Sequence, residues 1–518
     1  MRPAPGRVAL IAIPVLFLGY FFVYPVTSIL LEASTGTGGL SFLTTRATTS
    51  ALWFTLWQAT VSTALTLVVA FPLTWVLSTF RFPGRRLVLA VVTVPFVLPT
   101  VVVASAFIAL GLRDSVAAIL LAHVFFNVSV IVRTVTTVWA RLDRSTIEAA
   151  RVLGASPWQS FRRVTLPLLA PSIGAATSIV FLLCFTSFGI VLILGGLRHR
   201  TIEVEIYQRV TTFLDLPAAG ALALVQLVGI TAVMAVYARM QERRSRRLRL
   251  RPEEQVLRAP RGRERWTVAA IVGTSLLMVL IPPAVLVARS LRGGAAGWRF
   301  LADPAPLAID PGAAIANSLQ SAAIAALIAL LVGVPAAMTI ARAAPSWGRW
   351  VDVVVMLPLG TSAVTIGLGF LVALDRPIDL RTAPIIVPIA HALVAIPFVV
   401  RAVLPTIRSI QSVLRDAAAV LGASPRRVWR EVDLPLMARA VTVAGGFAAA
   451  VSLGEFGATA FIVRPGTITV PTLIFRLLGR PGAVTFSGAM AMAVILMVMV
   501  AGLVMALDRL RAGELGSF

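Results

Sequence analysis

Long apolar stretches of about 20 residues, the length a helix needs to cross a bilayer, constrain this chain more than any other feature. Inside a bilayer every backbone polar group must be paired within the protein, which leaves only helices and closed β-barrels. Barrel strands alternate polar and apolar residues, whereas residues 322–331 are apolar without interruption. The sequence therefore predicts an all-α, polytopic membrane protein. Twelve spans are predicted, near residues 8–31, 52–79, 87–112, 115–135, 168–195, 219–238, 267–288, 314–341, 351–374, 383–404, 438–463 and 483–507.

The distribution of charge predicts the orientation. Only 13% of the residues are charged, against about 25% in a typical soluble domain. The chain contains no lysine, so all 46 basic residues are arginine. If the N-terminus is cytoplasmic, 33 of these 46 arginines fall on the cytoplasmic side, as the positive-inside rule requires. Both termini are then cytoplasmic. Arginines that set the orientation and lie near anionic lipid headgroups account for the net charge of +24, so nucleic-acid binding is not needed to explain it.

One passage of the sequence occurs twice. Residues 148–167 read EAARVLGASPWQSFRRVTLP, and residues 416–435 read DAAAVLGASPRRVWREVDLP. The offset is 268 residues, and His123 and His391 keep it. The chain is therefore a tandem duplication.

The duplication predicts two permease-sized halves, residues 1–240 and 266–518, joined by residues 241–265. Each half has six predicted spans, so both insert with the same orientation as parallel repeats around an axis along the membrane normal. The joining segment is rich in arginine and contains two prolines. We interpret it as a flexible cytoplasmic linker, and a regulatory or lipid-binding segment is the alternative.

Each copy of the repeated passage predicts two short helices joined at a glycine. In the first copy Ser145 is expected to cap one helix, with Glu148 completing a capping box. Gly154 ends that helix, and Ser156 with Pro157 begins the next. We call each such pair of short helices an elbow and place both elbows on the cytoplasmic surface. The alternative is an ordinary connecting segment between spans, which does not explain why both halves have nearly the same sequence there.

At these residues the chain resembles the fused permease subunits of binding-protein-dependent bacterial ABC importers, whose EAA loop has this pattern of acid, Ala-Ala and Gly. The resemblance implies a type I importer fold in the cytoplasmic (inner) membrane, two ABC ATPase subunits and an extracytoplasmic substrate-binding protein as partners, and no cofactor. In that family the loop docks on the ATPase. Asp416 stands where the first copy has glutamate. The docking residues implied are Glu148, Ala149, Ala150, Gly154, Asp416, Ala417, Ala418 and Gly422.

The substrate is suggested by further stretches. Residues 123–127, 181–189 and 201–208 are similar to thiamine-importer permeases. Fused ferric-iron permeases share the architecture and are the next candidate. Residues 452–458 resemble a stretch of molybdate and sulfate permeases. The expected binding protein would meet the outer segments 196–216 and 464–482.

Glu455 is the one acidic residue placed well inside a predicted span. An intramembrane carboxylate is costly and is a functional candidate by default. Its repeat equivalent is Ser187, and Phe456 and Phe188 follow the two residues in sequence. These four residues are the candidates for the translocation pathway, where a carboxylate beside aromatic rings suits an organic cation. The alternative is that Glu455 is hydrogen-bonded to neighbouring helices and only supports packing.

Other function classes are disfavoured. A Walker A loop needs a lysine, and the chain has none, so ATP hydrolysis falls to separate subunits and the chain is not an enzyme. Cys184 is the single cysteine, and the three histidines are too far apart for a metal motif. A secondary transporter could have parallel halves, but it has no use for two docking elbows.

Overall fold

The computed structural model describes residues 5–512 except 36–40, 144, 197, 245–255, 293–294, 304–309, 344, 377 and 411. These residues form helices, and no β-strand is present among them. The prediction of an all-α membrane fold is confirmed.

The chain forms two compact units, each of which combines separate segments of the sequence. The first combines residues 1–44, 206–227 and 290–518, and the second combines residues 45–205 and 228–289. The first span of each sequence half thus lies in the unit made mainly by the other half. The predicted boundaries 1–240, 241–265 and 266–518 describe the sequence repeat and stay a prediction.

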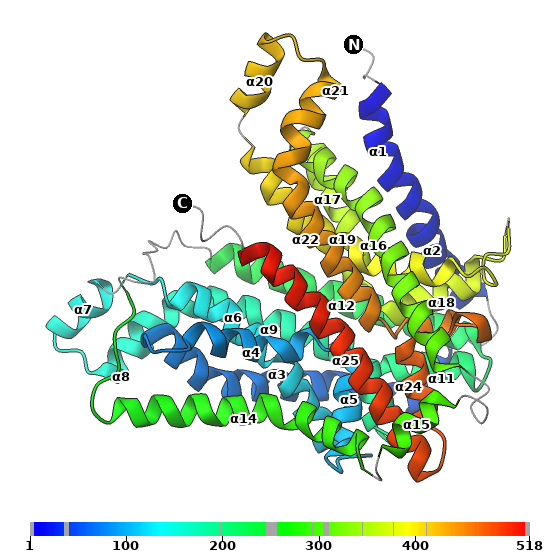
Figure 1. Cartoon of the computed structure of the whole chain (residues 1–518), viewed down its shortest axis with the longest axis horizontal. Coiled ribbons are helices and arrows are strands. Elements are labelled where there is room, and N and C mark those ends of the chain that lie inside the picture. The colour runs from blue at the N-terminus through cyan, green and yellow to red at the C-terminus, as the bar shows by residue number, and fades with distance from the viewer. Residues whose placement is uncertain are drawn as a thin grey trace. The chain divides into compact units, whose positions relative to one another are not determined.

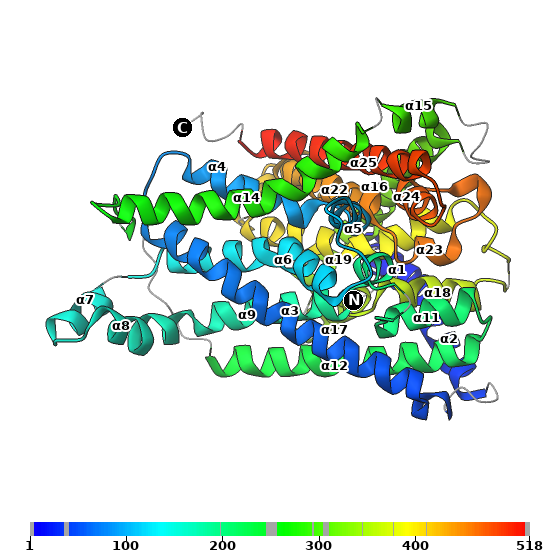
Figure 2. The same ribbon diagram turned by 90° about the horizontal axis from the view of Figure 1, so that it is seen from below.

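The second unit is built around three long helices, α3, α6 and α9, which run side by side (Figure 2). Their contact buries Ala59, Ile131 and Cys184. The helices of this unit are α3 (Arg46–Thr79), α4 (Arg85–Val97), α5 (Thr100–Ala109), α6 (Val116–Trp139), α7 (Ser145–Val152), α8 (Pro157–Ser160), η3 (Phe161–Thr165), α9 (Leu166–Phe185), α10 (Gly189–Leu194) and α14 (Glu264–Ser290), while α11 (Ile202–Thr211) and α12 (Leu216–Arg244) belong to both units.

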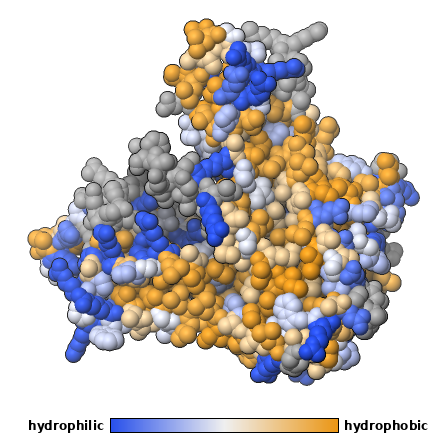
Figure 3. All heavy atoms as spheres, viewed as in Figure 1, coloured by the Kyte–Doolittle hydropathy of each residue, from blue (hydrophilic) through white to orange (hydrophobic). Residues whose placement is uncertain are grey.

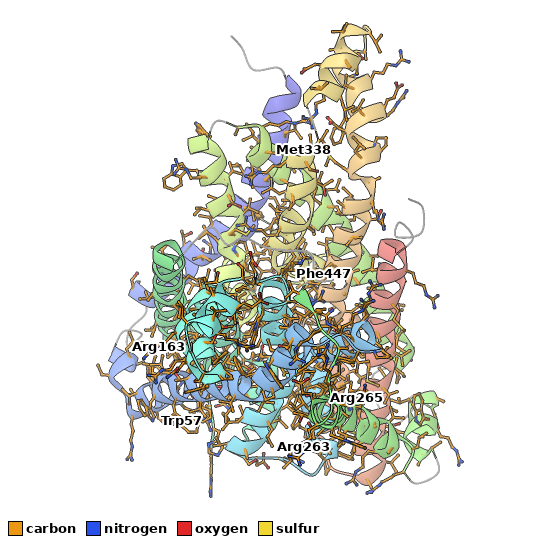
Figure 4. The ribbon with its side chains drawn as sticks, turned by 90° about the vertical axis from the view of Figure 1, so that its left-hand side faces the viewer. Trp57, Arg163, Arg263, Arg265, Met338 and Phe447 are labelled. Atoms are coloured by element: carbon orange, nitrogen blue, oxygen red, sulfur yellow. The ribbon has the colours of Figure 1, made fainter. Side chains whose placement is uncertain are left out.

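The first unit is built in the same way around α16, α19 and α22 (Figure 1). Met338 lies on α16 and Phe447 on α22 (Figure 4), and the Phe447 ring lies 5.4 Å from that of Phe398 on α19. The elements of this unit are α1 (Pro5–Leu18), η1 (Gly19–Val23), α2 (Tyr24–Thr35), η2 (Ser41–Thr44), α15 (Ala296–Ala302), α16 (Pro311–Arg342), α17 (Pro345–Met356), η4 (Leu357–Gly360), α18 (Ala363–Ala373), α19 (Ile386–Ser409), α20 (Ser412–Val420), α21 (Pro425–Val428), η5 (Trp429–Asp433), α22 (Leu434–Gly454), α23 (Thr459–Ile462), η6 (Pro465–Thr467), α24 (Val470–Leu478) and α25 (Ala483–Ala512).

Ten helices of the described residues are long and apolar enough to cross a membrane, or up to twelve if two bent pairs count as one span each. The bent pairs are α4 with α5, at 99°, and α17 and η4 with α18, at 95°. Spans were predicted near residues 87–112 and 351–374, and the structure shows that each of these stretches is bent. In the first pair the residue before Pro99 is extended, because the proline ring disfavours helical backbone at the preceding position.

Two predicted spans extend too far at their C-terminal ends. The predicted span 168–195 is interrupted after Phe185, and 438–463 is interrupted after Gly454. Short helices follow each interruption, α10 in one case and α23 in the other. Ser187 and Glu455 therefore lie in breaks between helices and not in the middle of a span.

The C-terminal part of the predicted linker is attached to the second unit. Arg258 pairs with Phe80 in an isolated parallel bridge, in which the Arg81 amide donates to the Arg258 carbonyl over 2.8 Å. The Arg258 guanidinium lies 4.8 Å from the centre of the Phe80 ring and donates to Glu264, which raises the pKa of Arg258. Arg263 and Arg265, labelled in Figure 4, lie at the start of α14. Residues 245–255 of the linker lie outside the described residues.

Candidate functional site: two elbows and two helix breaks

Helices α7 and α8 form the first elbow, and a glycine turn joins them. Gly154 has φ +85°, in the left-handed region that glycine adopts without a steric penalty. The Gly154 amide donates to the Arg151 carbonyl, and the Ala155 amide donates to the Ala150 carbonyl, each over 3.0 Å. This pattern is a Schellman motif, which pairs carbonyl groups left over at a helix end.

The second elbow, α20 with α21, repeats this geometry. Gly422 has φ +81°, and the Ala423 amide donates to the Ala418 carbonyl over 3.0 Å. The predicted glycine turn is therefore present at both copies.

In the first elbow, the predicted N-terminal cap is present at α8 but not at α7. Ser156 caps α8 with a capping box, in which the Gln159 amide donates to the Ser156 hydroxyl over 3.2 Å and the Gln159 side chain accepts from the Ser156 amide over 3.0 Å. Ser145, predicted as the cap of α7, is instead its first residue. Its amide donates to Asp143 over 3.0 Å, so the upstream aspartate satisfies this helix end.

The elbows expose large apolar side chains at equivalent positions. Val152 and Leu153 are each 87% exposed, and so are their equivalents Val420 and Leu421. In Figure 3 hydrophobic atoms lie beside hydrophilic ones at the elbow ends of the molecule. Contiguous exposed apolar side chains mark interaction sites. The sequence contained this signal in the repeated Val-Leu, which the prediction had treated only as part of a helix.

The docking residues that the resemblance implied lie on the same surface. Glu148, Ala149, Asp416 and Ala417 are exposed, and Ala150 and Ala418 are partly buried. The exposed acid of each elbow lies one helical turn before the exposed Val-Leu pair, on the same side of the helix as the valine.

The first helix break is organised by a buried histidine. His123 on α6 is 1% exposed and is placed between two hydroxyl groups. Its Nδ1 lies 3.0 Å from the Ser62 hydroxyl on α3, and its Nε2 lies 2.8 Å from the Ser187 hydroxyl. Phe188 is also buried. This histidine therefore connects α3, α6 and the break after α9.

The second helix break contains the equivalent histidine, His391, and also a glutamate, Glu455. His391 Nδ1 lies 2.7 Å from the Ser452 hydroxyl, and its Nε2 lies 2.7 Å from the Thr459 hydroxyl and 3.3 Å from the Glu455 carboxylate. Glu455 accepts hydrogen bonds from the amides of Ala458 and Thr459 over 3.0 and 3.2 Å, and from the Thr459 hydroxyl over 2.7 Å. Glu455 thus satisfies the amides at the start of α23.

This geometry supports the packing alternative for Glu455. The side chain is 5% exposed, and both carboxylate oxygens accept hydrogen bonds from the protein. Phe456 is 2% exposed, and its ring lies 5.3 Å from that of Phe475. These two candidates belong to the first unit, whereas Ser187 and Phe188 belong to the second.

The predicted outer segments are largely helical. Segment 196–216 contains α11, and segment 464–482 contains α24. The first residue of each helix is fixed to a hydroxyl group: the Ile202 amide donates to Thr55 over 2.9 Å, and the Val470 amide donates to Ser318 over 2.8 Å. Among the described residues of these segments, the exposed large apolar side chains are Phe213 and Leu214, at 54% and 80%.

Three buried acids were not recognised from the sequence. Glu203 and Glu205 on α11 are each 2% exposed, and Glu205 lies 3.6 Å from Arg200. Asp433, at the end of η5, is 3% exposed. The sequence could have indicated Asp433, because the first copy of the repeat has the uncharged Thr165 at the equivalent position. Among the described residues no group of three or more His, Cys, Asp or Glu side chains is placed to hold a metal ion.

Comparisons with known proteins agree with this architecture. Residues 70–247 match the family model described as the binding-protein-dependent transport system inner membrane component. The thiamine transport system permease protein of Brucella abortus is 29% identical over 501 residues, covering 90% of this chain and 88% of the relative. The thiamine transport system permease protein of Escherichia coli is 28% identical over 477 residues, covering 84% and 86%.

A sulfate transport system permease protein of Escherichia coli is also similar, at 29% identity over 268 residues. The match covers 48% of this chain but 96% of the sulfate protein. About half of this chain thus corresponds to one complete relative, as expected for two fused permease halves.

Proposed function

We propose that this chain, which is similar to the inner-membrane components of binding-protein-dependent transport systems, forms the substrate path of an ATP-driven importer by alternating access. Two ABC ATPase subunits dock on the α7–α8 and α20–α21 elbows. A substrate-binding protein delivers the substrate at the opposite membrane surface. The substrate is thiamine or a related organic cation.

The paired apolar exposure of the elbows carries this proposal. Val152, Leu153, Val420 and Leu421 are each 87% exposed at turns of the same geometry. Burying one such side chain stabilises a complex by roughly 1.5–3 kcal/mol before ordering costs. Two copies of a cytoplasmic subunit with a matching groove would each gain this energy, one copy at each elbow. Movement of that subunit would then reach α9 or α22 through η3 or η5, which lead directly into these helices.

The elbow assignment is tested by adding charge to the exposed apolar surface. The double variant Val152→Asp and Val420→Asp should insert normally but lose copurification with the cognate ATPase, because a charge cannot enter an apolar groove without a partner. Leu214→Asp is the control, since it adds an aspartate at an exposed leucine in a predicted outer segment. Normal ATPase binding by the double variant would overturn the assignment.

The proposed substrate rests on the thiamine permeases described above. The sulfate permease favours an anion as the second candidate, and none of the relatives described here supports the ferric-iron alternative. Reconstituted liposomes with the ATPase and the binding protein should accumulate labelled thiamine in the presence of ATP. Accumulation of sulfate without thiamine would replace the cation with the anion, while the permease assignment would stand.

A further inference from the structure

The second elbow is connected to two spans through a buried carboxylate. The Asp433 side chain is 4% exposed and lies between two arginines. Its Oδ1 accepts from Arg415 Nε over 2.7 Å, and its Oδ2 accepts from Arg342 Nη2 over 2.8 Å. These short distances are those of charge-assisted hydrogen bonds, which are stronger than neutral ones.

Each of the three residues belongs to a different element. Arg342 is the last residue of α16, Arg415 lies on the elbow helix α20, and Asp433 is the last residue of η5, directly before α22. We call these residues the Asp433 cluster. Arg415 immediately precedes Asp416, the acid of the repeated passage. The cluster therefore links the proposed docking surface to the ends of two long spans.

The first elbow carries other residue types at the positions of the Asp433 cluster. The equivalent positions, 268 residues earlier, are Thr74, Ile147 and Thr165. All three side chains are uncharged, and the Thr74 hydroxyl donates to the Ala70 carbonyl of its own helix over 2.8 Å. The two elbows thus share their turn geometry but differ in how their helices are attached to the spans.

Helix α20 buries few side chains, so the contact of Arg415 with Asp433 is important for holding it. Val413, Leu414, Val420 and Leu421 are all exposed, at 66%, 47%, 87% and 87%. The Arg415 side chain, in contrast, is 27% exposed and reaches the buried Asp433. A helix with so little buried surface could pivot at the Gly422 turn unless a side chain held it.

We propose that the Asp433 cluster is a rigid strut that makes the second elbow the stiffer of the two and transmits its displacement directly to α16 and α22. This proposal rests on the docking function proposed above. Arg415, Asp433 and Arg342 are then positioning residues, and the two ATPase contacts are mechanically unequal. At the first elbow the equivalent residues Thr74, Ile147 and Thr165 are uncharged and cannot form this ion-paired link.

The test replaces the whole cluster with the residues of the first half. Removing one partner of a buried ion pair leaves an uncompensated charge and is destabilising, whereas replacing all partners by neutral residues is often tolerated. The triple variant Arg342→Thr, Arg415→Ile and Asp433→Thr should therefore insert and bind the ATPase, and Asp433→Asn should give a lower yield. Arg427→Gln is the control, because it removes an exposed ion pair with Glu431 from the same elbow.

Two measurements separate a strut from a purely structural cluster. The first is the distance distribution between spin labels at Val420 and Leu331 in the permease alone, with Cys184 replaced by serine. It should be broader in the triple variant than in the wild type. The second is the amount of substrate transported per ATP hydrolysed, which should fall several-fold in the triple variant and stay unchanged in Arg427→Gln.

An unchanged distance distribution, or an unchanged transport-to-hydrolysis ratio, in the triple variant would overturn the strut. The distance measurement needs no ATPase. A wild-type permease that binds no ATPase would therefore refute the docking function, while the distance measurement would still decide whether the cluster stiffens the elbow.

Discussion

At residues 154 and 422 the backbone adopts a left-handed conformation, with φ of +85° and +81°. A Cβ atom at either position would meet no atom within 4 Å. The glycines are therefore required by backbone conformation and not by lack of space. An alanine would cost roughly 1–2 kcal/mol, because its Cβ lies too close to the following carbonyl oxygen.

This conformational requirement predicts a graded series at the elbows. Proline fixes φ near −65° and lacks an N–H group, so the double variant Gly154→Pro and Gly422→Pro should abolish uptake while inserting normally. The double variant with asparagine, which enters the left-handed region more readily, should retain most uptake. Gly19→Ala is the control, since Gly19 also has open space but no positive φ. Full uptake by a well-expressed proline variant would contradict the elbow assignment.

The hydrogen bonds of Glu455 change what a conservative substitution can reveal. Glutamine keeps the shape of glutamate but turns one acceptor into a donor. The two carboxylate oxygens accept from the backbone amides of Ala458 and Thr459 at the start of α23, so the new donor would face an N–H group. We expect Glu455→Gln to lower both thermal stability and uptake, and uptake alone therefore does not distinguish a packing role from a pathway role.

The two roles differ in whether substrate charge matters. If Glu455 only satisfies the start of α23, Glu455→Gln should reduce uptake of a cationic and of an uncharged thiamine analogue by the same factor. A selective loss of the cationic analogue, at matched protein levels, would instead place Glu455 in the pathway. Phe456→Leu provides a comparison, because it alters the buried neighbour without changing charge.

At the scale of elements, the end of the linker fixes the beginning of α14. Arg258 pairs with Phe80 through the backbone and with Glu264 through its side chain. Arg258→Gln should therefore speed hydrogen exchange of the Arg81 amide, which donates to the Arg258 carbonyl. Arg263→Gln, a neighbouring exposed arginine, should leave that rate unchanged. Equal exchange in wild type and Arg258→Gln would show that the side chain does not hold the bridge.

The length of the apolar stretches was sufficient to predict the helices but not the places where they are interrupted. Ten predicted spans overlap helices that are long and apolar enough to cross a membrane, because a run of about 20 apolar residues has few alternatives in a bilayer. The bend before Pro99 and the breaks at Ser187 and Glu455 were missed, since apolar residues lead up to Pro99 and resume soon after Ser187 and Glu455. The Asp433 cluster was missed because its partners are 91 and 18 residues apart in sequence.

The whole molecule combines segments of both sequence halves in each compact unit. Residues 1–44 belong to the unit that contains residues 290–518, and α14 belongs almost entirely to the unit that contains residues 45–205. Within the first unit, Gly369 of α18 closely approaches Pro25 of α2, where an added Cβ would lie 2.9 Å from the proline ring. Each unit is therefore incomplete without helices from the other sequence half.

This exchange predicts how a divided chain behaves. After a cut between residues 250 and 251, the first piece lacks α14 of the second unit, and the second piece lacks residues 1–44 of the first unit. Apolar faces that these helices cover in the intact chain would then stay exposed. Residues 1–250 and 251–518 should copurify and transport when coexpressed, because the exchanged helices can still pack. Each piece expressed alone should be degraded or aggregated. A monodisperse, stable half on its own, measured by size exclusion in detergent, would show that the halves fold independently and that the exchange is dispensable.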